Sequence, residues 1–376
     1  MVELQDIFRE YGEAYRQSHR LPYHTLRTMD AIEQCRTAKL GSHSDACEDC
    51  GHVRISYNSC RNRHCPKCQS LSKERWIMGQ KYNLLNVGYF HVVFTVPDTL
   101  NLLFLQNQRA LYGLLFKASA DALQELASDK RFLGATIGFT SVLHTWGQNL
   151  MHHPHIHCIV PGGGLDTIGR WKSTRRKFFL PIKVLSRKFR GKFLHYLKDQ
   201  NIDFHGSLQY LANPNDWNRF LSTLYRKEWI VYCKPPFKDA ACVVDYLGRY
   251  THRVAISNNR ILGLSNGQVS FKWRDYKDGN RWKTMLLAAE EFIRRFLMHI
   301  LPPGFIKIRH YGLLANRGKT MRLSLCKQLT NTLLVAKQPI STRDLILHLT
   351  GKDINLCPCC GSPNLLRSSL LQIDTS

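Results

Sequence analysis

The sequence predicts an α+β protein in which an N-terminal metal-binding region precedes a larger domain of strands and helices. Residues 35–68 are rich in Cys and His and lack a lasting hydrophobic period. An aromatic and β-branched run at 89–96 is typical of a buried strand, and helical patterns flank it. With 376 residues and roughly 150 residues per domain, we expect three parts: residues 1–85, 86–315 and 316–376.

The charge of the chain indicates a polyanionic partner. Lys and Arg number 53 against 28 Asp and Glu, a formal net charge of +25, while the hydrophobic content of 44% is that of a folded protein. No apolar stretch approaches the roughly 18 residues of a membrane helix, and the N-terminus does not resemble a leader peptide. We therefore expect a soluble, cytoplasmic, nucleoid-associated protein that binds nucleic acid rather than membrane.

The elements of the first 96 residues follow from hydrophobic spacing. Two short amphipathic helices are expected between Leu4 and about Thr37, and a further helix from about Leu71 to Leu85. The run that ends before Pro97 is expected to form the first strand of the second part.

The remaining elements alternate in type. We expect a helical region over about 102–126, strands at 135–146 and 155–160, a short helix at 245–252, and a hairpin whose tight primed turn contains Asn266-Gly267. A long amphipathic helix is expected from Thr284 to Ile300, and a basic helical tail from about Arg317.

Two Cys-x-x-Cys pairs predict a zinc site. Cys47, Cys50, Cys65 and Cys68 can place four thiolates about 2.3 Å from one tetrahedral zinc ion. An odd total of 13 cysteines, clustered in pairs, fits metal ligands better than disulfides. The alternative is that these are buried free cysteines.

Four further residues are candidates for a second zinc site. Its candidate ligands are Cys35, His43, Cys60 and His64; alternatively, Cys60 and His64 only flank the first site and Cys35 is a core residue. Near the C-terminus, Cys357, Cys359 and Cys360 form a lone knuckle whose role the sequence leaves open.

His155 and His157 predict half of a different metal site. On a strand, both imidazoles point to one face while Ile156 points to the other. A third ligand is expected from a neighbouring strand: Gln148 can supply a neutral oxygen, and His91, His152 and His153 are the competing candidates. Two imidazoles and an amide suit Mg²⁺ or Mn²⁺; the alternative is a pair of solvent-facing histidines on an edge strand.

Tyr246 and Tyr250 are candidate nucleophiles. If this segment is helical, tyrosines four residues apart lie on one face. A phenol can attack a metal-polarised phosphate and keep it as a phosphotyrosine. The alternative is two packed aromatic side chains.

A basic stretch predicts contacts to a DNA strand. Residues 170–192 contain ten Lys or Arg, with aromatic side chains interleaved (Trp171, Phe178, Phe179 and Phe189) that are expected to stack on bases. A solvated basic face is the alternative. The candidate DNA contacts are Lys172, Arg175, Arg176, Lys177, Arg187 and Lys188, together with Arg249 and Arg253 beside the tyrosines.

Taken together, these motifs resemble a known family. The order of the cysteine block Cys60-Arg-Asn-Arg-His-Cys-Pro-Lys-Cys68, then His153-Pro-His-Ile-His-Cys-Ile-Val-Pro-Gly-Gly-Gly164, then Tyr246-Leu-Gly-Arg-Tyr-Thr-His-Arg253 resembles the HUH-type two-tyrosine transposases of bacterial rolling-circle insertion sequences, the insertion sequence ninety-one family.

The resemblance implies a fold, a reaction and ligands. The fold would be an HUH endonuclease core, an antiparallel sheet with helices packed on it, after a zinc-binding domain. His155 and His157, with Gln148, would bind Mg²⁺ or Mn²⁺, and Tyr246 and Tyr250 would cut and rejoin single-stranded DNA, including DNA hairpins, at the ends of the element. A replication initiator of the same chemistry is one alternative, and a non-catalytic zinc-dependent DNA-binding regulator is another.

Overall fold

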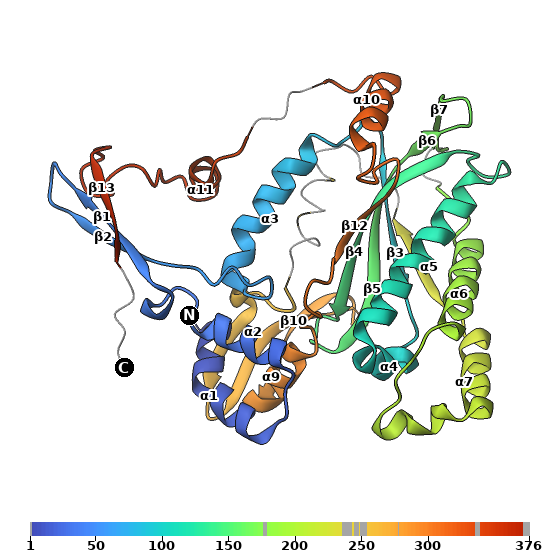
Figure 1. The fold of residues 1–376 in the computed structure, drawn as a ribbon, viewed down its shortest axis with the longest axis horizontal. Coiled ribbons are helices and arrows are strands. Elements are labelled where there is room, and N and C mark those ends of the chain that lie inside the picture. Colours follow the sequence, from blue (N-terminus) through green and yellow to red (C-terminus); the bar gives the residue numbers. More distant parts are fainter. Residues whose placement is uncertain are drawn as a thin grey trace.

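The computed structural model describes residues 2–175, 179–234, 243, 248, 254–276, 278–334 and 339–370. Over these ranges the protein is a mixture of helices and antiparallel sheets, as expected (Figure 1). The strands form a central seven-stranded sheet and two three-stranded sheets.

The central sheet has the strand order β7-β6-β4-β5-β3-β8, with β12 beside β4, and every neighbouring pair is antiparallel. The predicted strands at 89–96, 135–146 and 155–160 are its centre. Its strands are β3 (Tyr89–Thr95), β4 (Thr136–Trp146), β5 (His152–Pro161), β6 (Gly163–Leu165), β7 (Trp171–Ser173), β8 (Ile230–Lys234) and β12 (Ile308–Gly312).

One face of this sheet carries the main core. Phe90, Val92 and Phe94 of β3 point to this face together with Ile156 of β5, and helices cover them (Figure 1). These helices are α4 (Asn101–Gln106), α5 (Gln108–Ser128), α6 (Ile182–Lys198) and α7 (Pro214–Arg226), with the short turns η2 (Asp98–Leu100) and η3 (Gly206–Ala212).

On the side of the opposite face lies α3 (Pro66–Lys81) (Figure 1). Trp76 of α3 packs with Tyr89 and Ile159, which alternate away from the main core. Close by, α10 (Lys319–Leu329) closes a small cluster through Leu323. The face that carries His155 and His157 therefore has a cover different from that of the main core.

A second core joins the N-terminus to a late part of the chain. Leu4, Ile7 and Phe8 pack against Phe292 and Phe296, with the rings of Phe8 and Phe296 5.5 Å apart. Its elements are α1 (Leu4–Ser18), α2 (Tyr23–Glu33), η4 (Asn258–Arg260), β9 (Ile261–Ser265), β10 (Gln268–Asp275), β11 (Arg281–Ala288) and α9 (Ala289–Leu297).

This region confirms one prediction and corrects another. Asn266 and Gly267 both have positive φ, 49° and 72°, in the turn between β9 and β10, as a tight primed turn requires. The predicted helix 284–300 is wrong at both ends, because residues 281–288 pair with β10 along their whole length and the helix runs only from Ala289 to Leu297. Tertiary strand pairing overrides the helical spacing.

The third sheet combines both ends of the chain. It has the order β13-β1-β2, formed by β1 (Ser42–Cys47), β2 (Val53–Tyr57) and β13 (Leu365–Leu370). A short turn, η1 (Ala38–Leu40), precedes β1, and α11 (Thr342–Thr350) contacts α3. The strand β13 was not predicted. The domain boundaries at 85/86 and 315/316 stay a prediction, and contacts cross both of them.

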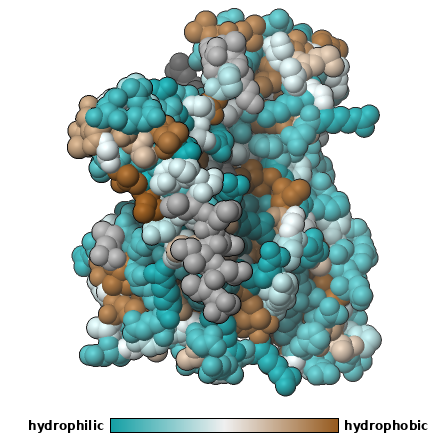
Figure 2. Space-filling model, turned by 60° about the vertical axis from the view of Figure 1, so that its left-hand side comes forward, coloured by the Kyte–Doolittle hydropathy of each residue, from teal (hydrophilic) through white to brown (hydrophobic). Residues whose placement is uncertain are grey.

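Among the described residues, no helix combines the length and apolar character that crossing a bilayer requires. The face turned toward the viewer in Figure 2 is mostly hydrophilic, with hydrophobic side chains in separate groups.

Candidate functional site

Three imidazoles meet on the α3 side of the central sheet. His144, His155 and His157 each offer a nitrogen, and these nitrogens all lie within 4.8 Å of one another. We call them the histidine cluster. Its ring centroids are 4.4 Å (His144 to His157), 4.7 Å (His155 to His157) and 5.4 Å (His144 to His155) apart. The spacing fits three ligands converging on one ion.

Strand pairing creates this cluster. His144 of β4 lies directly opposite His155 of β5, and Val142 lies opposite His157. Alternation then puts all three imidazoles on one face. The ring of Trp146 stacks on that of His144, with centroids 4.7 Å apart.

Two neighbours orient the rings of His155 and His157. His155 Nδ1 lies 2.6 Å from the carbonyl oxygen of His153. Because a carbonyl only accepts, Nδ1 carries the proton and Nε2 keeps its lone pair. His157 Nδ1 lies 2.8 Å from His91 Nε2. Burial lowers the pKa of His91 to about 3, so this contact is made by a neutral ring at pH 7.

The third imidazole, His144, was not named in the sequence analysis, which expected Gln148 as the third ligand; the assignment of Gln148 stays a prediction. Gln148 lies in the turn after β4, where its amide nitrogen donates to Tyr276 Oη at 3.1 Å. Of the named competitors, His91 contacts His157 through its ring, and His152 Nε2 is 2.9 Å from Tyr112 Oη. His144 was missed, although aligning 136–146 with 152–161 as an antiparallel pair would have indicated it.

The candidate nucleophiles Tyr246 and Tyr250, and the candidate DNA contacts Arg249 and Arg253, lie outside the described residues. Nothing in the structure tests these four assignments.

Two residues close to the tyrosines in sequence are described, and both are helical. Val243 is fully buried with Tyr89 and Ile159, on the face of the sheet that bears the histidine cluster. A Cβ added to Gly248 would lie 2.1 Å from Ile77 Cδ1, so the backbone of Gly248 lies directly against α3.

Four cysteines next to α3 form the first of two sulfur clusters. Cys35, Cys60, Cys65 and Cys68, the inner cysteine cluster, have all their sulfurs within 4.8 Å of one another. Cys68 Sγ lies 3.5 Å from Cys35 Sγ and 3.5 Å from Cys60 Sγ. Hydrogen bonds from Cys35, then from Cys60 and Cys65, lower the pKa of the Cys68 thiol.

The outer cysteine cluster joins segments that are far apart in the sequence. It consists of Cys47, Cys50, Cys357 and Cys360; Cys47 Sγ lies 3.6 Å from Cys360 Sγ, and Cys50 Sγ lies 3.6 Å from Cys357 Sγ. Each pair is followed by a glycine with positive φ, Gly51 at 71° and Gly361 at 77°. The two knuckles are therefore alike, a signal that the repeated Cys-x-x-Cys-Gly could have given.

Both sulfur clusters fit tetrahedral zinc. Four ligands at about 2.3 Å from zinc lie about 3.8 Å from one another, close to the 3.5–3.6 Å between neighbouring sulfurs here. The expected quartets are corrected: the pair Cys47 and Cys50 does not share a cluster with Cys65 and Cys68.

The histidines proposed for a second zinc site belong to neither sulfur cluster. His43 lies on β1, in register with Ser56 and Ser369 of the flanking strands. His64 Nε2 accepts a hydrogen bond from the Leu301 amide at 3.4 Å. Chain topology, and not spacing along the sequence, therefore selected the partners of each cysteine pair.

An ion-pair network around the buried carboxylate of Asp45 supports the outer cysteine cluster. Asp45 of β1 accepts hydrogen bonds from Arg367 of β13 and Arg54 of β2, its direct neighbours on either side, at 2.6 and 2.5 Å. The hydrogen bond from Arg367, and then that from Arg54, lower the pKa of the Asp45 carboxyl to about 2. The C-terminal strand β13 is thus held by the ion pair of Asp45 with Arg367 as well as by the nearby outer cysteine cluster.

The basic stretch keeps its predicted DNA contacts as a prediction but loses part of its predicted stacking surface. Phe179 and Phe189 are buried in the main core, so the expectation that their rings stack on bases is wrong. Arg187 is exposed on α6, and Lys188 pairs with Glu125, both in the helical layer across the sheet from the histidine cluster. Lys172 and Arg175 are exposed, whereas Arg176 and Lys177 lie outside the described residues.

Comparison with protein families gives two matches. A family model described as "Putative transposase" matches residues 138–321, which include the histidine cluster. A second model, described as "Transposase zinc-binding domain", matches residues 7–96, which include the whole inner cysteine cluster and the first half of the outer one.

Two curated relatives cover most of the chain. The "Putative transposase y4qJ" of Sinorhizobium fredii (strain NBRC 101917 / NGR234) is 49% identical over 368 residues, 95% of this chain and 92% of the relative. The "Transposase for insertion sequence element IS801" of Pseudomonas savastanoi pv. phaseolicola is 31% identical over 298 residues, 78% of this chain and 70% of the relative. No solved structure matches significantly.

Proposed function

Because the chain belongs to the IS91 family of transposases, we propose that it cuts and rejoins single-stranded DNA by HUH-type tyrosine chemistry, in rolling-circle transposition. The observation that carries this proposal is the histidine cluster on the central antiparallel sheet. A regulator without catalytic function has no need of three converging imidazoles.

The histidine cluster is the proposed site of a divalent cation. Bound there, the ion would polarise the scissile phosphate and offset its charge. Three imidazole donors are softer than two imidazoles and an amide, so the donor set favours Mn²⁺ over Mg²⁺. The His153 carbonyl and His91 would hold the rings of His155 and His157 in the ligating orientation.

Tyr246 and Tyr250 are the proposed nucleophiles. On a helix, residues 243, 246 and 250 share one face. Val243 packs on Ile159, which is two residues from His157 on the same face of β5. A helix continuing from this anchor would turn both phenols toward the histidine cluster.

The proposed reaction keeps the energy of the cleaved phosphodiester bond in a phosphotyrosine ester. A tyrosine oxygen forms a bond to phosphorus, the bond from phosphorus to the 3′ oxygen breaks, and the released 3′ hydroxyl takes a proton while the tyrosine loses one. Attack by a second 3′ hydroxyl reverses these steps and joins a new strand. Two tyrosines allow two strands to be held, and Arg249 and Arg253 would contact the phosphates.

The zinc-containing N-terminal region is the proposed recognition element for DNA ends or hairpins. A replication initiator would share the tyrosine chemistry. The family assignment favours transposition.

The decisive experiment is a covalent capture assay. Labelled single-stranded DNA from the ends of the element is incubated with protein and Mn²⁺ or Mg²⁺, and adducts that survive SDS are resolved by electrophoresis. The wild type should form an adduct, and a chelator should prevent it. The double variant Tyr246→Phe/Tyr250→Phe should bind the strand with unchanged affinity and form no adduct.

Tyr210→Phe is the matched control, since it removes one hydroxyl from an exposed tyrosine on η3, outside the histidine cluster. It should form the adduct normally. An adduct that persists in the double variant, or its loss in the control alone, would falsify the assignment.

A further inference from the structure

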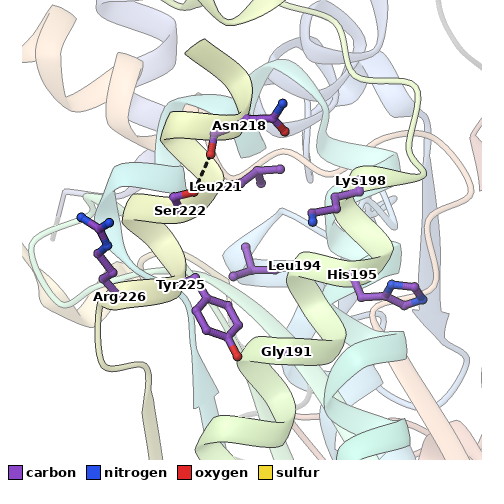
Figure 3. Close-up of a pocket in the computed structure, with 9 residues that line it drawn as sticks. All are labelled: Gly191, Leu194, His195, Lys198, Asn218, Leu221, Ser222, Tyr225 and Arg226. Atoms are coloured by element: carbon purple, nitrogen blue, oxygen red, sulfur yellow. Dashed lines mark hydrogen bonds between the residues drawn. The ribbon is translucent and has the colours of Figure 1, made fainter. Parts of the chain in front are cut away.

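A groove lies between α6 and α7 (Figure 3). None of the residues that line it belongs to the histidine cluster or the two cysteine clusters of the described residues. Its volume is about 610 Å³, within the range of sites that hold a small ligand. Leu194 and Leu221 form a buried apolar floor between the two helices. Gly191 leaves part of the wall open, because a Cβ added there would meet no atom within 4 Å.

The rim of this groove is cationic. Lys198 extends into the space between the helices, whereas the Arg226 guanidinium lies on the outer side of α7 and the His195 ring on the outer side of α6 (Figure 3). No carboxylate is among the residues that line it, in the part of the chain that the structure describes. Such a rim attracts an anionic group and repels a cationic one.

An aromatic ring completes the groove. Tyr225 of α7 is 58% exposed, and the guanidinium of Arg190 lies over its ring, 4.7 Å from the centroid. Arg190 also donates to the Lys227 carbonyl at 2.9 Å, which holds the guanidinium in place. A positioned ring beside an apolar floor suits a nucleobase, and the cations suit its phosphate.

The groove and the histidine cluster lie on opposite sides of the sheet. Phe189 and Phe193 of α6 belong to the main core, and the ring of Phe189 contacts that of Phe94, 5.0 Å away. Phe94 points away from the face that carries His157. A strand in the groove is therefore not at the histidine cluster.

We infer that the α6–α7 groove is a second binding site for single-stranded DNA. It takes one nucleotide unit, with its phosphate against Lys198 and its base against Leu194, Leu221 and Tyr225. Arg226, on the outer side of α7, contacts the next phosphate along the strand. This inference rests on the proposed function, because strand transfer requires two DNA segments on the protein at the same time. A duplex would not place an unstacked base in so narrow a hollow.

The test compares two double variants of the full chain that change the charge equally. Lys198→Glu/Arg226→Glu alters the groove, whereas Lys130→Glu/Lys183→Glu alters exposed side chains outside it. Binding is measured by fluorescence anisotropy with a labelled oligothymidylate longer than the roughly 16 nucleotides that one binding module covers. The groove variant should bind about tenfold more weakly, and the slope of log affinity against log salt should fall by about 1.4, two contacts at roughly 0.7 each. The control should change affinity by less than about threefold.

A filling variant separates the shape of the groove from its charge. Gly191→Gln keeps the net charge and replaces a helical glycine by a better helix former. It should weaken strand binding as the groove variant does and leave the melting temperature unchanged or higher. Normal binding by Gly191→Gln, or equal losses in the two double variants, would overturn the inference.

Two further measurements are needed. The first distinguishes a DNA phosphate from a free phosphate as the occupant of the groove, and the second distinguishes failure of this inference from failure of the proposed tyrosine chemistry. If inorganic phosphate or deoxyadenosine monophosphate raises the melting temperature of the wild type and not of the groove variant, while strand binding is equal in both, the groove is a small-molecule site and the inference is wrong. Adduct formation on a short strand should be normal in the groove variant. Loss of that adduct in the groove variant alone would also overturn the inference, whereas its absence in the wild type would count against the tyrosine chemistry and not against strand binding.

Discussion

The cysteine clusters and the histidine cluster gather their ligands in different ways. Each cysteine cluster brings together four thiols from two or more chain segments, at a spacing that fits the four ligands of a tetrahedral zinc ion. The histidine cluster has three imidazoles on two adjacent strands of a sheet that has its own apolar core. The first arrangement is suited to holding chain segments together, and the second to leaving a coordination position for substrate.

The two cysteine clusters also differ from each other. Cys35 and Cys65 are buried in the second core, among Met29, Ile32 and Phe292. The outer cluster lies at the end of a sheet whose β2 side chains Val53 and Ile55 are more than half exposed. Loss of metal should therefore disturb packing widely at the inner cluster and only locally at the outer one.

The largest effect is expected at the inner cysteine cluster. Cys68→Ser removes one of four zinc ligands, and structural zinc contributes on the order of 10 kcal/mol to folding. We expect one zinc fewer per chain and a melting temperature lower by more than about 10 °C. Cys68→His is the control, because it keeps a ligand and should retain more zinc and stability than the serine variant; equal losses in both would contradict the assignment.

Alanine variants of the histidine cluster should show the next largest effect, which should be on the rate of DNA cleavage and not on stability. Since a metal Lewis acid supplies several kcal/mol, His144→Ala and His155→Ala should each slow DNA cleavage by about 1000-fold or more. Zinc content and melting temperature should stay those of the wild type. Gln148→Ala is the comparison variant. If it slows cleavage by less than about tenfold, His144 is supported as the third ligand; if it slows cleavage more than His144→Ala does, Gln148 is supported instead.

A smaller effect on cleavage is expected for His91, which contacts His157 of the histidine cluster. His91→Asn removes the ring that contacts His157 Nδ1, and the loss of such a supporting contact typically weakens metal affinity by about 10 to 100-fold. Titrating cleavage with Mn²⁺ should show a raised half-saturating concentration and a nearly normal maximal rate. A lower maximal rate with unchanged metal affinity would indicate a different role.

The smallest effect on cleavage is expected at the outer cysteine cluster. Cys357→Ser/Cys360→Ser should lower the zinc content by one ion per chain and release β13 to hydrogen exchange, while cleavage of a short strand stays within about threefold. Cys359 is exposed and outside the cluster, so Cys359→Ser should keep both ions. If both variants retain all the zinc, the outer cysteine cluster does not bind zinc.

The sequence predicted what depends on neighbours along the chain. Alternation set His155 and His157 on one face, Asn266-Gly267 made a primed turn, and β3, β4 and β5 followed their β-branched and aromatic composition. The Cys-x-x-Cys spacing identified metal knuckles, and the resemblance identified the transposase family.

Tertiary structure alone decided which of these local units meet. The partner of Cys47 and Cys50 lies more than 300 residues away, held by β13 and the ion pair of Asp45 with Arg367. His144 reaches His155 only because β4 pairs with β5 in one particular register, and Phe189 is core because α6 packs on the sheet. Spacing fixes the geometry of a turn, knuckle or strand, but the partner across space is set by long-range pairing and burial, which no local period encodes.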